Sequence, residues 1–312
     1  HAGPELGNAF ADVISGRYSP AGRLAQTWYK SEYELAPIEC YNIIENDMTY
    51  LYYRGKPLYP FGYGLSYARF EYSDFDVKEN GDVISVSLDV TNVSETDSDE
   101  VVQIYFRMEN PSVKRPLRQL VAFAREHIKG GSKRHFEFDI KKSELRFYDV
   151  SRERFAVEQG RYTFMAGASS EDIRLTKTID VSAEIIPPRE LCKGVKAKNY
   201  DGKCGAKMKY SKKLEQHYML GGGLIYNNCV LGEADSIEIV CGSRVNAGKI
   251  TVRYGGETLC EAEVKPTVDV TKFETVTAQF DKAVLAGIDR EKPAVFELWM
   301  PEQIYILGFR TY

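Results

Sequence analysis

The chain has 312 residues, with 41 lysine and arginine residues against 45 acidic residues and a net charge of −4. This length suits two or three domains, each able to bury its own core. Because the sequence has no excess of positive charge and no apolar run approaching the ~20 residues that span a bilayer, we expect neither nucleic acid nor a membrane as a partner.

The first sixty-six residues predict very little regular structure. Residues 5–15 place apolar side chains at helical spacing, and Gly16 is a typical C-terminal stop, so one amphipathic helix is expected there. A turn at 19–22 then leads into a predicted strand at 23–29. One helix and one strand cannot enclose a core. Residues 1–66 are therefore predicted to end a larger α/β layer, with an apolar face that has no partner in this chain.

From residue 82 the hydrophobic period changes to two. Ile84, Val86, Leu88 and Val90 alternate with polar residues, which is typical of a half-buried strand. The further runs VVQIYF, QLVAFA, HFEFDI, RYTFMAGA and IRLTKTIDV follow at intervals typical of a sandwich. Residues 67–183 are predicted to form an antiparallel β-sandwich of immunoglobulin-like or fibronectin type III-like form.

A second all-β pattern follows the sequence IIPPRE. Its adjacent prolines predict a linker at 185–190, and the runs SIEIV, KITVRY, TVTAQF, AVFELWM and IYILGF predict a β-sandwich or jelly roll over 184–312. The three glycines at 221–223 lack the lysine of a phosphate loop and are predicted to form a turn. The predicted fold class is mainly β: the tail of an α/β sandwich domain, a fibronectin type III-like sandwich and a jelly-roll β-sandwich.

Metal and cofactor sites are not expected. The histidines (His1, His127, His135, His217) lack ligand spacing, and the six cysteines contain no C-x-x-C pair. Five of the cysteines lie after residue 190, so one or two disulfides and buried free thiols in a reducing compartment remain open alternatives, with a cytoplasmic location slightly favoured over secretion.

Two long segments carry a family resemblance. The segments GNAFADVISGRYSPAGRLAQTWY and MTYLYYRGKPLYPFGYGLSYARFEYS resemble the closing portion of glycoside hydrolase family 3, which comprises β-glucosidases and β-xylosidases. The similarity continues through EVVQIYFRMENPSVKRPLRQLVAFARE and VEQGRYTFMAGASS, covers about residues 3–182, and implies the family's fibronectin type III-like domain.

This resemblance implies a retaining exo-β-glycosidase that hydrolyses terminal β-linked glucose or xylose. The family's Asp nucleophile and Glu acid/base precede the region represented here, so no catalytic residue is expected in this chain and the chain alone is predicted to be inactive. Its implied partners are the missing N-terminal catalytic region, encoded by the same gene or a separate chain, and β-linked oligosaccharides. The alternative is a non-catalytic carbohydrate-binding or scaffold protein.

The aromatic segment at 57–73 acquires a role from the same resemblance. In the family it closes the α/β sandwich domain and leads into the fibronectin-like domain, so Tyr59, Phe61, Tyr63 and Tyr67 are expected to fill the seam between them. The alternative is a wall for sugar stacking.

The last part of the chain resembles family 6 carbohydrate-binding modules in AKNYDG, GGGLIYNN, TKFETV and QIYILGFRT. The resemblance implies a sugar held between Tyr218 and Phe273, with Gln303 hydrogen-bonded to a hydroxyl group. Lys198 stands where the family has an acidic residue, and Tyr305 stands where it has a calcium-binding Asp, so no calcium is expected. A degenerate module that only packs against its neighbours is the alternative.

Overall fold

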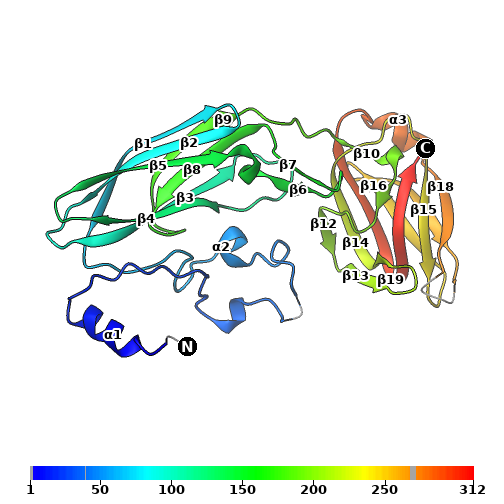
Figure 1. Cartoon of the computed structure of the whole chain (residues 1–312). Helices are drawn as coiled ribbons and strands as arrows, with labels where there is room; N and C mark the ends of the chain where they lie inside the picture. The colour runs from blue at the N-terminus through cyan, green and yellow to red at the C-terminus, as the bar shows by residue number, and fades with distance from the viewer. Residues whose placement is uncertain (1–2, 39, 268–271) are drawn as a thin grey trace. The chain divides into compact units, whose positions relative to one another are not determined.

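The computed structural model describes residues 3–38, 40–267 and 272–312 and is mainly β (Figure 1). The chain divides into two compact units. The first unit comprises residues 1–147 and 155–185, and the second comprises residues 148–154 and 186–312. Each is described by itself below.

The N-terminal segment of the first unit has no core of its own. Its helices are α1 (Leu6–Ile14), the short 3₁₀ helix η1 (Glu32–Glu34) and α2 (Thr49–Tyr52). The predicted helix at 5–15 is thus confirmed. Among the described residues, the two clusters that form hydrophobic cores include none before residue 70. The expectation that this segment encloses no core by itself is therefore confirmed.

The predicted strand at 23–29 is wrong. In its place, residues 24–28 run beside residues 59–63 through separate backbone hydrogen bonds, such as Trp28 N to Tyr59 O at 2.9 Å and Leu24 N to Tyr63 O at 2.8 Å. A regular ladder does not form because the partner segment contains Pro60, which has no N–H to donate, and turns at Gly62 with φ +81°.

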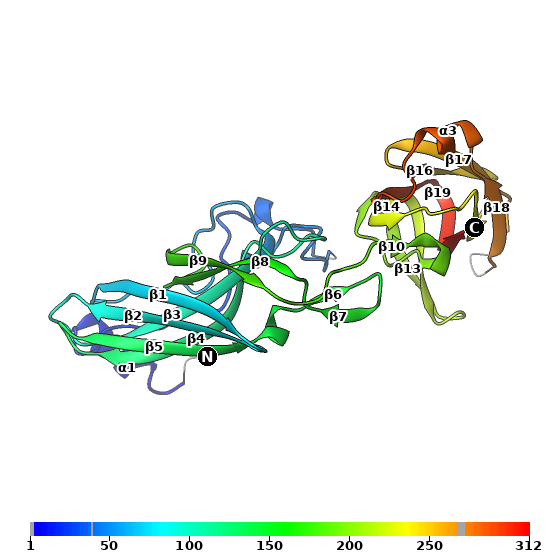
Figure 2. The same ribbon diagram turned by 90° about the horizontal axis from the view of Figure 1, so that it is seen from above.

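The remainder of the first unit is a β-sandwich. One sheet has the order β1-β2-β5 and the other the order β4-β3-β8-β9, and Figure 2 shows β1, β2 and β5 together as one layer. The strands and the 3₁₀ helix η2 have these bounds: β1 (Phe70–Asn80), β2 (Val83–Asn92), β3 (Ser98–Met108), β4 (Gln119–Ile128), β5 (Lys133–Lys141), η2 (Lys142–Leu145), β8 (Gly160–Gly167) and β9 (Ile173–Val181). The short strands β6 (Phe147–Asp149) and β7 (Arg154–Ala156) each share residues with the segment 148–154 of the second unit.

Alternation along these strands builds the core between the two sheets. On β2, Ile84, Val86, Leu88 and Val90 are at most 1% exposed, while the residues between them face outward. Burial at about 25 cal/mol per Å² of apolar surface makes these alternating positions the main stabilising contribution of the strand. All the predicted runs of this region form strands.

The second unit consists of strands folded around one core, with a single short α-helix and one 3₁₀ helix among the described residues. Its elements are β10 (Arg189–Glu190), the 3₁₀ helix η3 (Leu191–Lys193), β11 (Val195–Lys196), β12 (Gly202–Cys204), β13 (Lys207–Ser211), β14 (Gln216–Val230), β15 (Ser236–Ser243), β16 (Gly248–Tyr254), β17 (Glu257–Val264), β18 (Glu274–Gln279), α3 (Lys282–Gly287) and β19 (Ala294–Thr311). The long strands β14 and β19 pair with each other and connect most of the sheet.

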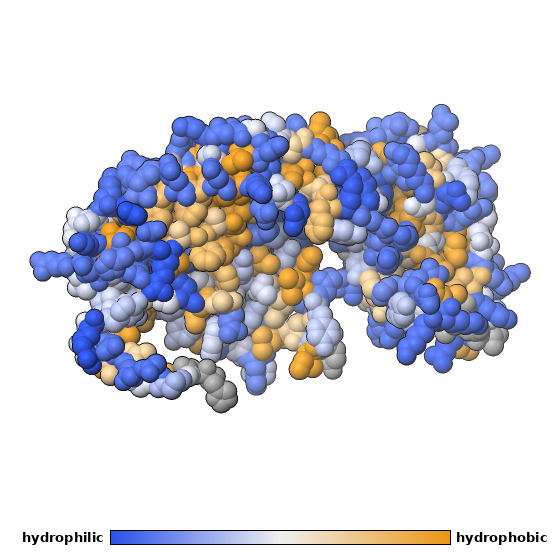
Figure 3. Space-filling view, in the orientation of Figure 1, coloured by the Kyte–Doolittle hydropathy of each residue, from blue (hydrophilic) through white to orange (hydrophobic). Residues whose placement is uncertain are grey.

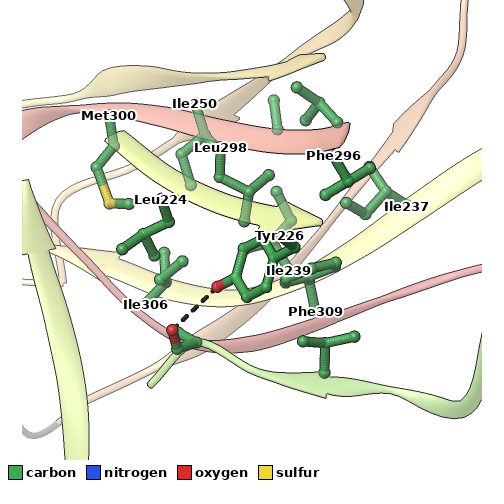
Figure 4. Packing of buried hydrophobic residues seen from close by; sticks show 14 of the residues in the cluster. Leu224, Tyr226, Ile237, Ile239, Ile250, Phe296, Leu298, Met300, Ile306 and Phe309 are labelled. Carbon is green, nitrogen blue, oxygen red and sulfur yellow. Dashed lines mark hydrogen bonds between the residues drawn. The ribbon is translucent and has the colours of Figure 1, made fainter. Parts of the chain in front are cut away.

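The core of this unit packs aromatic rings against branched aliphatic side chains (Figure 4). Phe296 and Phe309 stack with ring centroids 5.0 Å apart, and Tyr226 meets Phe309 edge to face at 5.1 Å. The Tyr226 hydroxyl group, although fully buried, donates to the Ala197 carbonyl at 3.0 Å, so its polar atom is satisfied inside the core.

The glycine triplet at 221–223 forms a bulge within β14, so the predicted turn is wrong. Gly221 and Gly222 have φ of +58° and +71°, and the register with β19 shifts between Leu220 and Gly222. A Cβ at Gly222 would lie 2.3 Å from the backbone N of Ala206. Neighbouring strands thus approach so closely that only glycine fits the kink.

Three further predictions for the second unit need correction. The runs at 294–300 and 304–309 belong to one strand, β19, because its partner β14 continues past the bulge. The end of the predicted linker, Arg189–Glu190, is the strand β10, which pairs with β14 in parallel. The short helix α3 has no counterpart in the predicted pattern; Asp281 caps its N-terminus by accepting from Ala283 N at 2.8 Å.

Candidate functional site

The helix α1 presents an apolar face that the described chain leaves uncovered. None of its residues is buried; Leu6, Phe10 and Ile14 are 44%, 59% and 78% exposed. These three side chains recur at the spacing of one helix face. An isolated helix of nine residues is only marginally stable in water, so this face needs a partner surface.

More apolar surface continues along the same N-terminal segment. Figure 3 shows apolar side chains, in orange, at the surface of the first unit. The exposed large apolar residues between 15 and 45 are Tyr18, Trp28, Tyr33, Leu35, Ile38, Tyr41, Ile43 and Ile44. Such a concentration is typical of an interaction surface rather than of a solvated segment. The expectation of an uncovered apolar face is confirmed for the helix.

The aromatic seam between the N-terminal segment and the sandwich centres on Phe61 and Tyr50. Their rings stack with centroids 4.2 Å apart and an interplanar angle of 13°, and Tyr50 also meets Tyr105 of β3 edge to face at 6.1 Å. The Tyr50 hydroxyl oxygen accepts from Leu120 N at 3.3 Å. Burial raises the pKa of Tyr50, so its phenol stays neutral.

A buried amide fixes the backbone of this seam. The Gln103 side chain donates from Nε2 to the carbonyl oxygens of Gly62 at 3.2 Å and Ala168 at 2.6 Å, and its Oε1 accepts from the Tyr105 hydroxyl group at 2.6 Å. A Cβ at Gly62 would lie 2.0 Å from Gln103 Oε1. The glycine of this aromatic segment is thus required both by its positive φ and by this close contact.

The four aromatic residues predicted to fill the seam have different environments. Phe61 lies in it, and Tyr63 packs against Tyr59 with centroids 5.2 Å apart. Tyr59 and Tyr67 are 40% and 51% exposed, so they border the seam instead of filling it, although the Tyr67 hydroxyl group donates to Val13 O at 2.7 Å.

Two partners in the seam were missed from the sequence. Tyr50 belongs to MTYLYY, a segment that carries the family resemblance, and Tyr105 lies on a predicted strand. The available signal was the density of aromatic residues in 50–63, which occupy positions 50, 52, 53, 59, 61 and 63.

The acidic residues Glu5, Asp12 and Asp47 of the N-terminal segment lie at or near its surface. Glu5 is exposed on the surface, and Asp12 pairs with Arg17 at 3.3 Å. Asp47 pairs with Lys114 Nζ at 2.7 Å. These carboxylates face solvent or cationic partners, as expected for surface charge.

The structure brings two of the three predicted sugar-binding residues of the second unit together. The rings of Tyr218 and Phe273 lie 6.2 Å apart at 69°, and both meet Tyr305 edge to face, at 5.8 Å and 5.0 Å. Tyr305 is fully buried, and its hydroxyl group forms hydrogen bonds with Thr267 Oγ1 at 2.6 Å and Lys272 O at 3.1 Å. Tyr218 and Phe273 therefore contact each other and do not form parallel walls with a gap between them.

The third predicted residue, Gln303, lies two positions before Tyr305 on β19. The Gln303 side chain lies beside Gly248, with Nε2 3.4 Å from the position that a Cβ of this glycine would occupy. Lys198 is exposed. Within the described residues, no group of three or more His, Cys, Asp or Glu side chains is arranged to hold a metal ion.

The six cysteines are free thiols in the described structure: Cys229 and Cys241 are buried, Cys260 is half-buried, and Cys40, Cys192 and Cys204 are exposed. Burial raises the pKa of the Cys229 and Cys241 thiols to about 12. None of the described helices has the length and apolar character needed to cross a membrane.

Two segments of the chain match known families. Residues 1–67 match the glycosyl hydrolase family 3 C-terminal domain, and residues 100–170 match the fibronectin type III-like domain. The first range contains the uncovered helix α1, Tyr50 and Phe61, and the second contains Gln103 and Tyr105 of β3.

Curated relatives give the same result. The chain is 34% identical over 199 residues to thermostable beta-glucosidase B of Acetivibrio thermocellus, covering 59% of this chain and 26% of the relative. It is 35% identical over 180 residues to a xylan 1,4-beta-xylosidase of Xylanibacter ruminicola, covering 57% of this chain and 20% of that protein. The chain thus spans about a quarter or less of the length of these relatives and corresponds to their C-terminal portion.

Solved structures agree with this correspondence. A crystal structure of a beta-glucosidase from Kluyveromyces marxianus in complex with glucose superposes with a TM-score of 0.53 at 32% identity, covering 57% of this chain and 23% of that one. A beta-D-glucoside glucohydrolase from Trichoderma reesei superposes with a TM-score of 0.52 at 28% identity, covering 57% of this chain and 29% of that one.

Proposed function

We propose that this chain is the C-terminal portion of a retaining exo-β-glycosidase that hydrolyses terminal β-linked glucose or xylose. The observation that carries the proposal is the uncovered apolar face of α1, which lies inside the segment that matches the family 3 C-terminal domain. A face of this kind is what remains when a helix is described without the rest of its α/β layer.

The chain's contribution would be accessory. The nucleophile and the acid/base of a retaining glycosidase are two carboxyl groups about 5 Å apart, and both would lie in an N-terminal region on the same or a separate chain. The seam built by Phe61, Tyr50 and Gln103 would then hold the end of that α/β layer on the fibronectin-like sandwich.

A non-catalytic carbohydrate-binding or scaffold protein is the alternative. It requires no N-terminal partner, and its apolar helix face would instead be solvated. The two functions therefore differ in whether α1 binds a catalytic region.

Reconstitution distinguishes them. The chain alone is assayed on aryl β-glucoside and aryl β-xyloside, and then co-expressed with the part of the Acetivibrio thermocellus beta-glucosidase B that precedes its matched C-terminal segment. We expect no turnover by the chain alone, and a purified complex with turnover after co-expression. A Phe10→Asp/Ile14→Asp variant should lose the complex while the sandwich stays folded. Turnover by the chain alone, or wild-type chain that forms no complex, would contradict the proposal.

We further propose that the second unit binds β-linked oligosaccharides as a family 6-like module through Tyr218, Phe273 and Gln303. The support is the half-buried aromatic pair held by Tyr305, in which Tyr218 could stack on one face of a sugar. With one sugar face stacked, we expect a dissociation constant in the high-micromolar to millimolar range, which corresponds to a binding free energy of roughly −4 to −6 kcal/mol.

Calorimetric titration with neutral xylo- and cello-oligosaccharides tests this binding. Tyr218→Ala should abolish the heat signal, and Phe273→Ala should weaken it because Tyr218 loses its support. An affinity unchanged in both variants, or no binding by the wild-type chain, would contradict sugar binding and leave the second unit with a purely structural role.

A further inference from the structure

The hairpin of β13 and the start of β14 carries the most concentrated positive charge of the second unit. Residues 202–217 contain five lysines and one acidic residue, Glu215, a local net charge of 5 − 1 = +4 in a chain whose net charge is −4. The rest of the chain therefore carries −4 − 4 = −8. A charge separation of this size creates a local field that attracts anions to the hairpin.

The lysines of this hairpin face solvent. Strand β13 pairs with β14 on one side, and its residues from Lys207 to Tyr210 are all exposed. Lys207, Lys209 and Lys212 form no ion pair with any acidic residue among those described. By contrast, Lys249 in the same unit pairs with Glu261 at 2.8 Å.

The register places two of these lysines on the same sheet face as an aromatic ring. Lys209 lies directly opposite Tyr218, and Lys207 lies opposite Leu220, so all four side chains share one face of the sheet. Tyr218 is braced from the other side by Phe273 and Tyr305. This face thus carries one aromatic ring and two lysines on neighbouring strands, and Figure 1 shows β13 and β14 side by side.

We propose that this face binds a carboxylated oligosaccharide, that is, one that carries a uronic acid residue. The inference rests on the proposed function, because it assigns the ligand class of the same module. A pyranose ring would stack on Tyr218, and its carboxylate would pair with Lys207 and Lys209. The seam and the uncovered α1 face play no part in this binding.

Two simpler roles explain less of the geometry. Lysines on an edge strand protect it from pairing with other chains, but this protection requires no aromatic ring fixed beside them. A long polyanion such as nucleic acid would also extend over the remainder of the chain, whose charge of −8 repels it. A short oligosaccharide contacts the hairpin alone.

The experiment compares two ligands that differ by one carboxylate. The full chain is titrated by calorimetry with a neutral xylo-oligosaccharide and with the same oligosaccharide carrying one glucuronic acid side group. At low salt we expect the charged ligand to bind about tenfold more tightly, and we expect the difference to shrink in about 0.5 M NaCl because salt screens exposed charges.

Charge variants locate the effect. Lys207→Gln/Lys209→Gln should reduce the affinity for the charged ligand to that for the neutral one. Lys282→Gln/Lys292→Gln removes the same charge from exposed positions elsewhere in the unit and should keep the preference. Circular dichroism confirms that each variant is folded.

Three results would overturn the inference: equal affinity for the two ligands, a preference that survives Lys207→Gln/Lys209→Gln, or equally tight binding of single-stranded DNA or polyglutamate. The glycosidase reconstitution does not depend on the hairpin lysines, so a failure here is distinguishable from a failure of the proposed activity.

Discussion

Arg23 and Glu100 form a buried ion pair that ties the N-terminal segment to strand β3 of the sandwich. Arg23 Nη2 lies 2.8 Å from Glu100 Oε2, and the two side chains are 12% and 2% exposed. The other carboxylate oxygen, Oε1, accepts from the Tyr72 hydroxyl group at 2.7 Å. Both oxygens of this buried carboxylate are therefore satisfied, one of them by a residue more than seventy positions earlier in the chain.

Arg23→Ala should destabilise the first unit by about 3 kcal/mol, because it leaves the Glu100 carboxylate buried without its cation. Urea unfolding followed by tryptophan fluorescence and circular dichroism measures the change in the free energy of unfolding. Arg23→Ala/Glu100→Gln should recover part of the loss, since no unpaired charge remains. If the destabilisation in the double variant equals the sum of those in Arg23→Ala and Glu100→Gln, the two residues are not coupled.

The effect of Arg23→Ala should depend on pH. Burial raises the pKa of Glu100 above its ordinary 4.5, against the opposing effects of the Tyr72 hydrogen bond and Arg23. A carboxyl group with a raised folded pKa binds its proton more tightly in the folded state, so its contribution to stability is full below its unfolded pKa and is lost as pH rises through the folded pKa. Without Arg23 the pKa rises further. The destabilisation should therefore be larger near pH 7 than near pH 4, and a loss independent of pH would contradict this origin.

Phe10→Ser on α1 should leave the stability of the chain alone within about 0.5 kcal/mol of wild type, because the side chain is already 59% exposed. Ile84→Ala, at a fully buried position of the sandwich core, is the contrasting control and should cost about 2–5 kcal/mol. Thermal unfolding of both variants provides the measurement. A large loss in Phe10→Ser would mean that α1 packs against this chain in solution.

Thiol labelling should separate the cysteines into two groups. Cys40, Cys192 and Cys204 are exposed and should react with an aromatic disulfide reagent at once, whereas Cys229 and Cys241 should react only after unfolding. The buried thiols combine inaccessibility with a pKa raised to about 12. Mass spectrometry of the labelled peptides identifies the sites, and immediate labelling of Cys229 would contradict the packing of the second core.

His135 should titrate above its ordinary pKa of 6.5. Its Nδ1 lies 2.5 Å from Asp89 Oδ1, and the hydrogen bond to this carboxylate raises the pKa of the imidazole. The stabilisation that protonated His135 contributes to the folded state is fully present below about pH 6.5 and is lost as the pH rises through the pKa of His135 in the folded state. NMR titration of the ring protons measures the pKa, and Asp89→Asn should return it towards the ordinary value. An identical titration in both proteins would exclude the interaction.

Local sequence pattern was enough to predict the strands of the sandwich, the helix at 6–14 and the absence of a core in the N-terminal segment. Alternation of apolar residues at Ile84, Val86, Leu88 and Val90 needs no distant partner to be recognised, because side chains of a strand alternate between its two faces. The uncovered helix face was predictable for a different reason. Apolar residues at helical spacing define one face of the helix, and a single neighbouring strand cannot cover that face.

The contacts between segments that are far apart in the sequence could be known only from the folded structure. The triplet at Gly221 is a bulge and not a turn because the backbones of β19 and the 204–206 segment approach it closely. Phe61 stacks on Tyr50, and Tyr218 meets Phe273 edge to face, through contacts across separate parts of the chain. Residue type predicted that these rings would be buried or bind sugar, but the angle and distance between two rings depend on the backbones that carry them, and those positions are fixed only by the packed fold.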